Sequence, residues 1–171
     1  PTIVEVQFEG LRRVDDEAIA RMMESKEGTE LRPELVTEDL RAVYGSGFFR
    51  DVSISKEDVP DGVRLIVSVK EKPSIRQLEF IGVKSVGDDD VSGVVDVRPL
   101  TILSVDQVKR NVTKIEDLYI EKGYYLADVS YRIKPVPDNE YEVDVIFEIV
   151  ENAKVIVKQL TFVGNKNISS E

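Results

Sequence analysis

The sequence contains no cysteine and no histidine among its 171 residues. These absences exclude disulfide bonds, zinc sites with Cys or His ligands, cysteine nucleophiles and the commonest general base. The redox compartment stays open, because a chain without cysteine suits the cytosol and the periplasm equally. No apolar run approaches the roughly 20 residues of a membrane-spanning helix, and the start PTIVEV lacks the regions of a signal peptide. We therefore expect a mature segment cut from within a longer protein.

Positive charge is also scarce. The chain carries 23 Lys and Arg against 33 Asp and Glu, a formal net charge of -10, and both of its halves are acidic. Because phosphate contacts need clustered Lys and Arg, this balance argues against nucleic acid or an anionic membrane surface as the main partner. The 42% of hydrophobic residues is typical of a folded protein with a buried core.

An internal repeat organises the chain. The stretch Val6–Val14 recurs at Leu78–Val86 and again at Leu160–Ile168, each time with a phenylalanine two residues before a glycine. The stretch Val43–Val52 (VYGSGFFRDV) is echoed by Leu118–Val129, which keeps the order aromatic, glycine, aromatic pair, Asp and Val. Repeats of this kind mark one structural unit used several times. They predict two complete domains, 1–72 and 73–152, and the start of a third, 153–171.

Each unit predicts the order strand, helix, helix, strand, strand. Alternating apolar and polar residues in Val4–Glu9 predict a strand, and Asp15 is a favourable N-cap for a short helix. Pro33 and Ser104 suit the starts of the longer second helices. The apolar stripes of these helices comprise Val36, Leu40, Val43 and Tyr44 in the first unit, and Val108, Val112, Ile115 and Tyr119 in the second. Turns at 60–62 and 137–139 lead into alternating final strands.

This order of elements determines a topology. Two antiparallel helices return the chain so that the first and last strands can pair in parallel, with the middle strand on the far side of the last. The prediction is an α+β fold of tandem β-α-α-β-β domains. Each domain has a three-stranded mixed sheet with the last strand central, and two antiparallel helices cover one face.

The glycines in VYGSGFFRDV raise the possibility of a phosphate loop. Such a loop follows a strand and opens a helix, whereas Gly45 and Gly47 follow a helix and precede a strand, where the helix carbonyls repel anions. We therefore interpret Gly47, like Gly123, as a left-handed residue at a helix C-terminus. The aromatic pairs Phe48-Phe49 and Tyr124-Tyr125 then fix the incoming strand against the helix stripe.

The acidic run Asp88-Asp89-Asp90 could suggest a metal site or an acid/base pair. Acidic residues in a first helical turn also complement the helix dipole, and calcium loops need more ligands at set spacings. We favour the helix start. Asp51 and Asp128 recur at equivalent places, but nothing nearby forms a catalytic pair with either, so we expect no enzyme activity, no cofactor and no metal.

The FxG strand end, the helix ending in G-[FY]-[FY] and the hairpin closing on V-x-E (Val69–Glu71) together resemble the POTRA (polypeptide-transport-associated) domain. Their order, repeated twice with a third start, covers essentially the whole chain. The first unit is most similar to the N-terminal POTRA domain of BamA-type outer-membrane protein assembly factors. The linkage Asp96–Leu103 departs from the family pattern, because the usual glycine before the second helix is missing there.

The resemblance implies the soluble periplasmic part of an integral outer-membrane protein from a Gram-negative bacterium. Its partners would be unfolded outer-membrane β-barrel proteins, accessory lipoproteins or periplasmic chaperones, and its own C-terminal membrane β-barrel, which is absent from this chain. The alternatives are the POTRA arm of a two-partner-secretion transporter and a structural spacer that binds no client. A third domain start argues against the transporter, since such transporters generally carry two of these domains.

The mechanism that both the fold and the resemblance suggest is β-augmentation, in which an extended client segment pairs with an exposed edge strand. We expect the middle strands to be the open edges and the first strands to be the second choice. Lys56 and Lys134 near the strand ends are equally explained as edge protection. The candidate interaction residues are Arg50, Asp51, Val52, Ser53, Ile54, Ser55 and Lys56 in the first unit, and Asp128, Val129, Ser130, Tyr131, Arg132, Ile133 and Lys134 in the second. The strand Val155–Val163 is expected to stay extended and either fray or pair with an edge of a neighbouring molecule.

Overall fold

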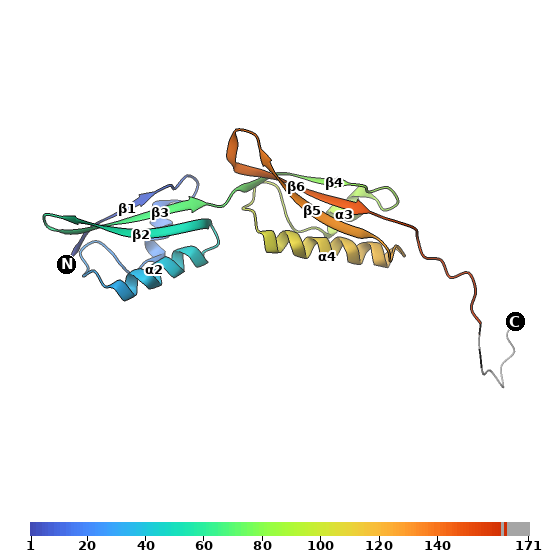
Figure 1. The fold of residues 1–171 in the computed structure, drawn as a ribbon, viewed down its shortest axis with the longest axis horizontal. Helices are drawn as coiled ribbons and strands as arrows, with labels where there is room; N and C mark the ends of the chain where they lie inside the picture. The colour runs from blue at the N-terminus through green and yellow to red at the C-terminus, as the bar shows by residue number, and fades with distance from the viewer. Residues whose placement is uncertain (162, 164–171) are drawn as a thin grey trace. The chain divides into compact units, whose positions relative to one another are not determined.

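Figure 1 shows the chain in a computed structural model, which describes residues 1–161 and 163. The chain divides into two compact units, one built mainly from Pro1–Ser74 and the other mainly from Ile75–Pro135 and the strand residues that follow Asp144. No helix in the described part of the chain is long and apolar enough to cross a membrane.

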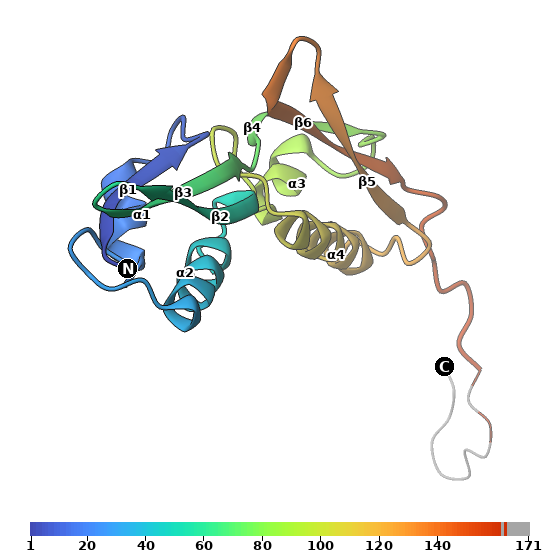
Figure 2. The ribbon, with the colours of Figure 1, turned by 60° about the vertical axis from the view of Figure 1, so that its left-hand side comes forward.

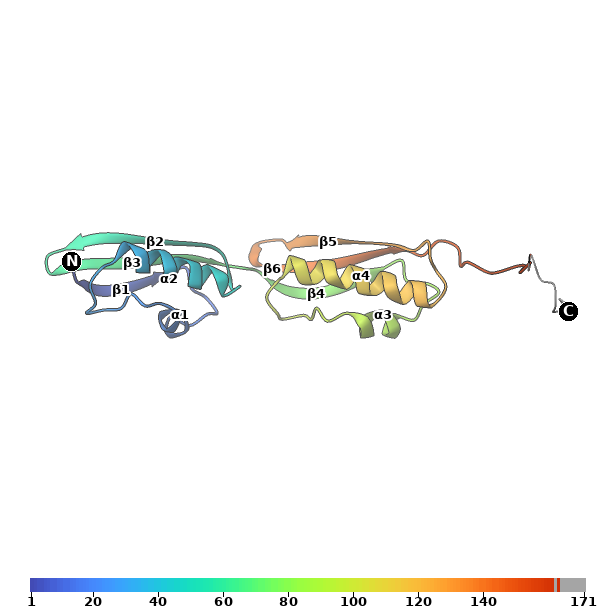
Figure 3. The same ribbon diagram turned by 90° about the horizontal axis from the view of Figure 1, so that it is seen from below.

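The first unit contains β1 (Ile3–Glu9), α1 (Asp16–Met22), α2 (Pro33–Gly45), β2 (Phe49–Val59) and β3 (Gly62–Glu71). Its sheet has the order β1-β3-β2, with β1 parallel and β2 antiparallel to the central β3. Figure 2 shows α2 beneath the sheet, and Figure 3 shows α1 on the β1 side. The predicted topology is confirmed.

The second unit contains β4 (Ser74–Ile81), α3 (Asp88–Val94), α4 (Val105–Glu121), β5 (Asp128–Val136) and β6 (Asn139–Val150). Its sheet has the order β4-β6-β5, so the last strand is again central. The long helix α4 lies against this sheet in Figures 1 and 3. The second unit therefore repeats the α+β architecture of the first.

The core of each unit lies between the sheet and its helices. In the central strand β3, alternate residues from Val63 to Val69 are buried. Val67 and Val69 pack with Ile19 of α1 and Val43 of α2, and Val63 and Leu65 pack with Ile3 of β1. In the second unit, Phe147 of β6 stacks on Phe80 of β4 at 5.5 Å between ring centroids. Burial of this kind contributes about 25 cal/mol per Å² of apolar surface, and it is the main force that holds each helix pair on its sheet.

The helix ends follow the sequence signals with one exception. Pro33 is the first residue of α2, and the Ser104 hydroxyl accepts a hydrogen bond from the Gln107 N–H at 3.3 Å. Gly47 and Gly123 have φ angles of 84° and 92°, which confirms their left-handed conformation after the helices. Asp15 occupies the N-cap of α1, but its side chain makes no capping hydrogen bond. The acidic run from Asp88 forms the first turn of α3, as favoured above.

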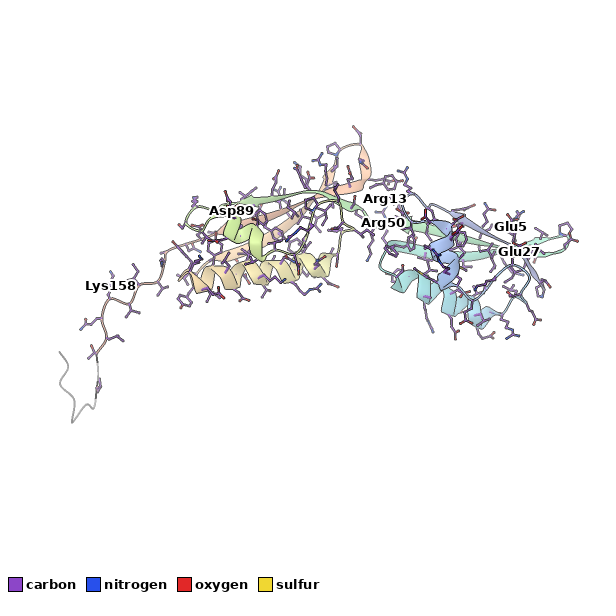
Figure 4. All side chains as sticks on the ribbon, turned by 180° about the vertical axis from the view of Figure 1, so that it is seen from behind. Glu5, Arg13, Glu27, Arg50, Asp89 and Lys158 are labelled. Atoms are coloured by element: carbon purple, nitrogen blue, oxygen red, sulfur yellow. The ribbon has the colours of Figure 1, made fainter. Side chains whose placement is uncertain are left out.

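The expected start of a third domain forms no helix or strand in residues 151–161 and 163. The Val155 N–H donates to the Gly123 carbonyl at 3.0 Å, which links this segment to the end of α4. Figure 4 labels Lys158 in the same segment. The remainder of the expected start, Phe162 and 164–171, lies outside the described residues.

Candidate functional site

The structure places the candidate residues of the first unit, 50–56, in β2. This strand pairs with β3 from Asp51 opposite Lys70 to Lys56 opposite Leu65. No strand lies on its other side within the described residues. Figure 4 labels Arg50 near the start of the strand. β2 is therefore an edge, as the sequence predicted, and its outward backbone groups are available for pairing.

The side chains of β2 alternate between the core and solvent. Val52 and Ile54 pack against the core, whereas Ser53 and Ser55 are exposed. A groove of about 220 Å³ runs between this strand and the start of α2. Its walls are mainly apolar and comprise Leu31, Pro33, Val36, Ile54, Ser55, Lys56 and Leu65. A strand added at this edge would thus find unpaired backbone groups along β2, and its inward side chains would lie in the groove.

The structure places the candidate residues of the second unit, 128–134, in β5. β5 pairs with the central β6 and has no strand beyond it among the described residues. Val129 is buried and Tyr131 is packed against the core, while Arg132 forms an ion pair with Glu148 of β6 at 3.2 Å. The same alternation recurs, with one difference: an arginine is held on the outer face of the sheet.

The first strands, the second choice for the open edge, are partly covered. In the first unit, the Ile3 N–H donates to the Thr29 carbonyl and the Gly28 N–H donates to the Ile3 carbonyl, both at 2.8 Å. In the second unit, the Ile75 N–H donates to the Thr101 carbonyl at 2.8 Å and the Leu100 N–H donates to the Ile75 carbonyl at 2.7 Å. The loop before each second helix therefore occupies the start of the edge.

This loop also shows what replaces the missing glycine. Gly28 has a φ angle of 83°, and Leu100, which lies five residues before α4 as Gly28 lies five before α2, has a φ of 65°. A leucine in this region is strained by about 1 to 2 kcal/mol. Its side chain is 84% exposed, so packing does not offset the strain.

Two buried glutamates, whose roles the sequence did not reveal, bind the loop after each first strand. The Glu71 carboxylate accepts hydrogen bonds from the N–H groups of Arg12 (2.8 Å), Arg13 (3.0 Å) and Val14 (3.1 Å). Burial opposes ionisation of Glu71, but these backbone donors outweigh it and hold its pKa below the usual value. The glutamate at the end of the Val69–Glu71 motif thus binds a nest of backbone N–H groups.

Glu151 repeats this arrangement in the second unit. It accepts from the N–H groups of Lys84 (2.7 Å) and Ser85 (2.9 Å), and from the Tyr119 hydroxyl (2.9 Å). Burial again opposes ionisation, and the hydrogen bonds from Ser85, Lys84 and Tyr119 lower its pKa to about 2. Burial together with this carboxylate raises the pKa of Tyr119. The Val69–Glu71 motif was visible in the sequence, and its counterpart here is Ile149-Val150-Glu151, but the partners of the two glutamates were not visible.

The glycine of the FxG motif has a steric role. A Cβ added to Gly10 would lie 2.1 Å from the Val69 carbonyl oxygen, and one added to Gly82 would lie 1.9 Å from that of Ile149. Both glycines also have positive φ angles, 86° and 90°. The repeat therefore conserves within this chain a close approach between the end of the first strand and the central strand.

A buried polar residue on each second helix, Asp39 in α2 and Asn111 in α4, fixes the loop that follows the first helix of the same unit. Asp39 of α2 accepts from the N–H groups of Glu24 (2.6 Å) and Ser25 (3.0 Å). In α4 the equivalent residue is Asn111, which accepts from the Asp96 N–H at 2.7 Å and donates to the Asp96 carboxylate at 2.6 Å. Hydrogen bonds from Lys114 and Asn111 hold the pKa of Asp96 well below its usual range.

The charged residues described above hold loops and neighbouring strands through hydrogen bonds and ion pairs. Across residues 1–161 and 163, no group of three or more carboxylate residues is arranged to hold a metal ion. The edge strand β2 has unpaired backbone groups beside an apolar groove, and this combination suits an extended peptide.

Comparison with known proteins gives a consistent set of matches. A family model described as POTRA, surface antigen variable number repeat, matches residues 1–72 and 73–152. The outer membrane protein assembly factor BamA of Nitratidesulfovibrio vulgaris is 25% identical over 167 residues, which are 98% of this chain and 21% of that protein. The chain therefore spans about a fifth of the length of this curated relative.

Solved structures show the same fold. The N-terminal domain of Omp85 from Thermosynechococcus elongatus has a TM-score of 0.62 at 22% identity, covering 88% of this chain and 63% of that one. POTRA1-3 of the periplasmic domain of Omp85 from Anabaena has a TM-score of 0.53 at 22% identity, covering 88% of this chain and 61% of that one.

Proposed function

The chain belongs to the POTRA family, and from this premise we propose that it is a periplasmic interaction module of an outer-membrane β-barrel assembly factor. In this function it binds unfolded outer-membrane protein clients by β-augmentation and acts as a binding module rather than an enzyme. Support comes from the BamA relative, which matches 98% of the chain and is named an outer membrane protein assembly factor. The family model matches both units.

The observation that carries the proposal is the openness of β2 and β5. Both are edge strands, and the opposite edges are partly closed by the loops that pair with Ile3 and Ile75. Backbone pairing at an edge gives affinity that tolerates many client sequences, because every peptide carries the same N–H and C=O groups. The interaction residues in this proposal are 50–56 and 128–134.

The groove beside β2 favours client segments that carry apolar side chains. Ile54 and Leu65 line it from the sheet and Val36 lines it from α2, so an apolar side chain of the added strand would be buried there. Lys56 lies at the same groove and forms an ion pair with the exposed Asp58 at 3.3 Å. Such an exposed pair is weak, so it does not oppose binding strongly.

The proposal extends to the organisation of the protein. We propose POTRA domain boundaries at 1–72 and 73–152, with 153–171 as the start of a third domain. Further partners are accessory lipoproteins or periplasmic chaperones and a membrane β-barrel of the same protein, since the chain spans about a fifth of its BamA relative.

An NMR titration tests this function. The probe is a capped peptide from one transmembrane strand of an outer-membrane β-barrel protein. Its control is the same peptide methylated on alternate backbone nitrogens, which keeps every side chain but cannot form a regular strand pair. Amide shifts should concentrate on β2 or β5 with the first peptide and should be largely lost with the second.

Two results would contradict the proposal. Shifts that are absent at millimolar peptide would favour a structural spacer. Equal binding of the methylated peptide would show that side-chain contacts, and not β-augmentation, hold the client.

A further inference from the structure

A second groove lies at the opposite edge of the first unit, between β1 and α1. It has a volume of about 230 Å³, and its apolar lining is formed by Val6 and Phe8 of β1 and Ala20 and Met23 near α1. Figure 3 shows α1 on this side of the sheet, with β2 on the other. The central strand β3 separates this groove from the edge of the proposed function.

The groove contains a buried hydroxyl without a partner. Ser25 lines it and is only 4% exposed, yet its Oγ makes no hydrogen bond with any described residue. Its backbone N–H is held by the Asp39 carboxylate at 3.0 Å, which fixes the position of the loop. Buried hydroxyls are almost always hydrogen-bonded, so an unpaired one in a groove indicates a group that arrives from outside.

The backbone beside the groove is open beyond the covering loop. The loop that pairs with Ile3 closes only the beginning of β1, and no described strand lies beyond Glu5–Glu9. A segment added along this part of β1 would place alternate side chains over Val6 and Phe8, in the groove. The remaining side chains would lie on the outer face of the sheet, beside Glu5 and Glu9.

This outer face carries unbalanced negative charge. Arg64 is shared between Glu5 at 2.7 Å and Glu57 at 2.8 Å, so two carboxylates share one cation. Among the described residues, Glu9 accepts hydrogen bonds from two neutral groups, the Ser68 hydroxyl and the Gln7 amide, each at 3.2 Å. Basic residues are therefore the complement for the outward positions of an added strand.

The other edge differs from this one in the middle of its strand and at its groove. The central outward positions of β2, Ser53 and Ser55, are neutral and exposed, whereas Asp51 and Glu57 toward its ends also face outward, opposite Lys70 and Arg64 of β3. At the groove of this edge, Lys56 is a cation. At the rim of the β1 groove, Lys26 and Glu27 carry opposite charges and cancel. Figure 4 labels Glu5 and Glu27 on this unit. The preference for basic residues is therefore weaker along the middle of β2 than along β1.

We propose that the groove between β1 and α1 is a second binding site for an extended segment, and that its occupant alternates apolar with basic residues. The apolar side chains fill the groove, the basic ones pair with Glu5 and Glu9, and the segment's backbone or a polar side chain satisfies the Ser25 hydroxyl. The proposal shares with the proposed function the premise that this chain binds extended peptides, but it concerns a different edge.

The test uses the whole 171-residue chain and two capped peptides, one alternating Val and Phe with Lys and one with Glu in place of Lys. By NMR titration, the Lys peptide should shift the amides of β1, α1 and the Ser25 loop and should bind about tenfold more tightly than the Glu peptide, because two cross-strand charge pairs are replaced by repulsions. A Lys peptide that binds no better than the Glu peptide would overturn the charge preference.

Two variants separate the groove from the edge. Ala20→Leu fills the groove and should abolish the β1 shifts, whereas the matched Ala18→Leu, on the same helix but outside the groove lining, should leave them unchanged. Ser25→Ala removes the unpaired hydroxyl and should weaken binding several-fold while the fold stays intact by circular dichroism. Equal binding by the Ala20→Leu and Ala18→Leu chains would overturn the site.

The location of the shifts also separates this site from the proposed function. Shifts confined to β2 and α2 would contradict the second site and support the first. Shifts confined to β1 and α1 would do the reverse, and shifts at neither edge would contradict both.

Discussion

Replacing Glu151 with glutamine should destabilise the second unit strongly. The carboxylate accepts three hydrogen bonds, from the N–H groups of Lys84 and Ser85 and from the Tyr119 hydroxyl, at 2.7 to 2.9 Å. Hydrogen bonds to a charged group contribute about 1.5 to 3 kcal/mol each, and those to a neutral group about 0.5 to 1.5. All three bonds end on Oε1, so the glutamine oxygen can keep them only as weaker bonds to a neutral acceptor, and its NH2 group replaces the Oε2 that accepts from the Ser85 N–H at 3.1 Å. We expect a loss of about 3 kcal/mol in the free energy of unfolding.

The loss of unfolding free energy caused by Glu151→Gln should become smaller as the pH falls. The folded-state pKa of Glu151 is about 2, against 4.5 in the unfolded chain. A lowered folded-state pKa adds stability that is fully present above pH 4.5 and is lost as the pH falls toward 2. Allowing for solvent screening, the ionised form of Glu151 contributes about 2 kcal/mol of this kind to the free energy of unfolding. The difference between the wild type and Glu151→Gln should therefore narrow as the pH falls.

Thermal unfolding followed by far-UV circular dichroism measures both effects, since the chain has no tryptophan. For a domain of this size, 3 kcal/mol corresponds to a fall of roughly 10 to 20 °C in the Tm of the second unit. The control is Glu148→Gln on the same strand, which removes only the exposed ion pair with Arg132 and should cost under about 1 kcal/mol. Equal losses for Glu151→Gln and Glu148→Gln, or a gap that does not narrow at low pH, would refute the reasoning.

Four further substitutions probe the backbone of the repeat, all by the same unfolding measurement. Gly82→Ala should prevent the second unit from folding, because its Cβ would lie 1.9 Å from a carbonyl oxygen; a cooperative transition at the wild-type temperature would contradict this. Leu100→Gly should stabilise by about 0.5 kcal/mol, because relief of the left-handed strain exceeds the entropy cost of glycine, while Gly28→Ala, with open space around the new Cβ, should destabilise by a similar amount. Shifts of the same sign for these two would disprove the strain argument. Asp39→Ala should cost about 2 to 3 kcal/mol, since it leaves the part-buried N–H of Glu24 and the buried N–H of Ser25 unpaired, and a neutral result would mean that water replaces the carboxylate.

The sequence by itself determined the repeat, the order of elements and the edge position of β2 and β5. These follow from local signals: alternating apolar residues make strands, the stripe from Val36 to Val43 makes a helix, and Gly47 ends it. A hairpin after two helices then leaves little choice for which strand is central. The position of the candidate residues 50–56 and 128–134 on edges could thus be predicted without coordinates.

Only the tertiary structure decided which groups meet across long separations. Glu71 binds N–H groups 57 to 59 residues away, and no local pattern shows that three donors converge on one carboxylate. The loop over Ile3 and the groove around Ser25 depend in the same way on how a loop folds back onto a strand. Periodicity reports which face of an element is buried, whereas the partners of a buried polar group are set by chain geometry in three dimensions.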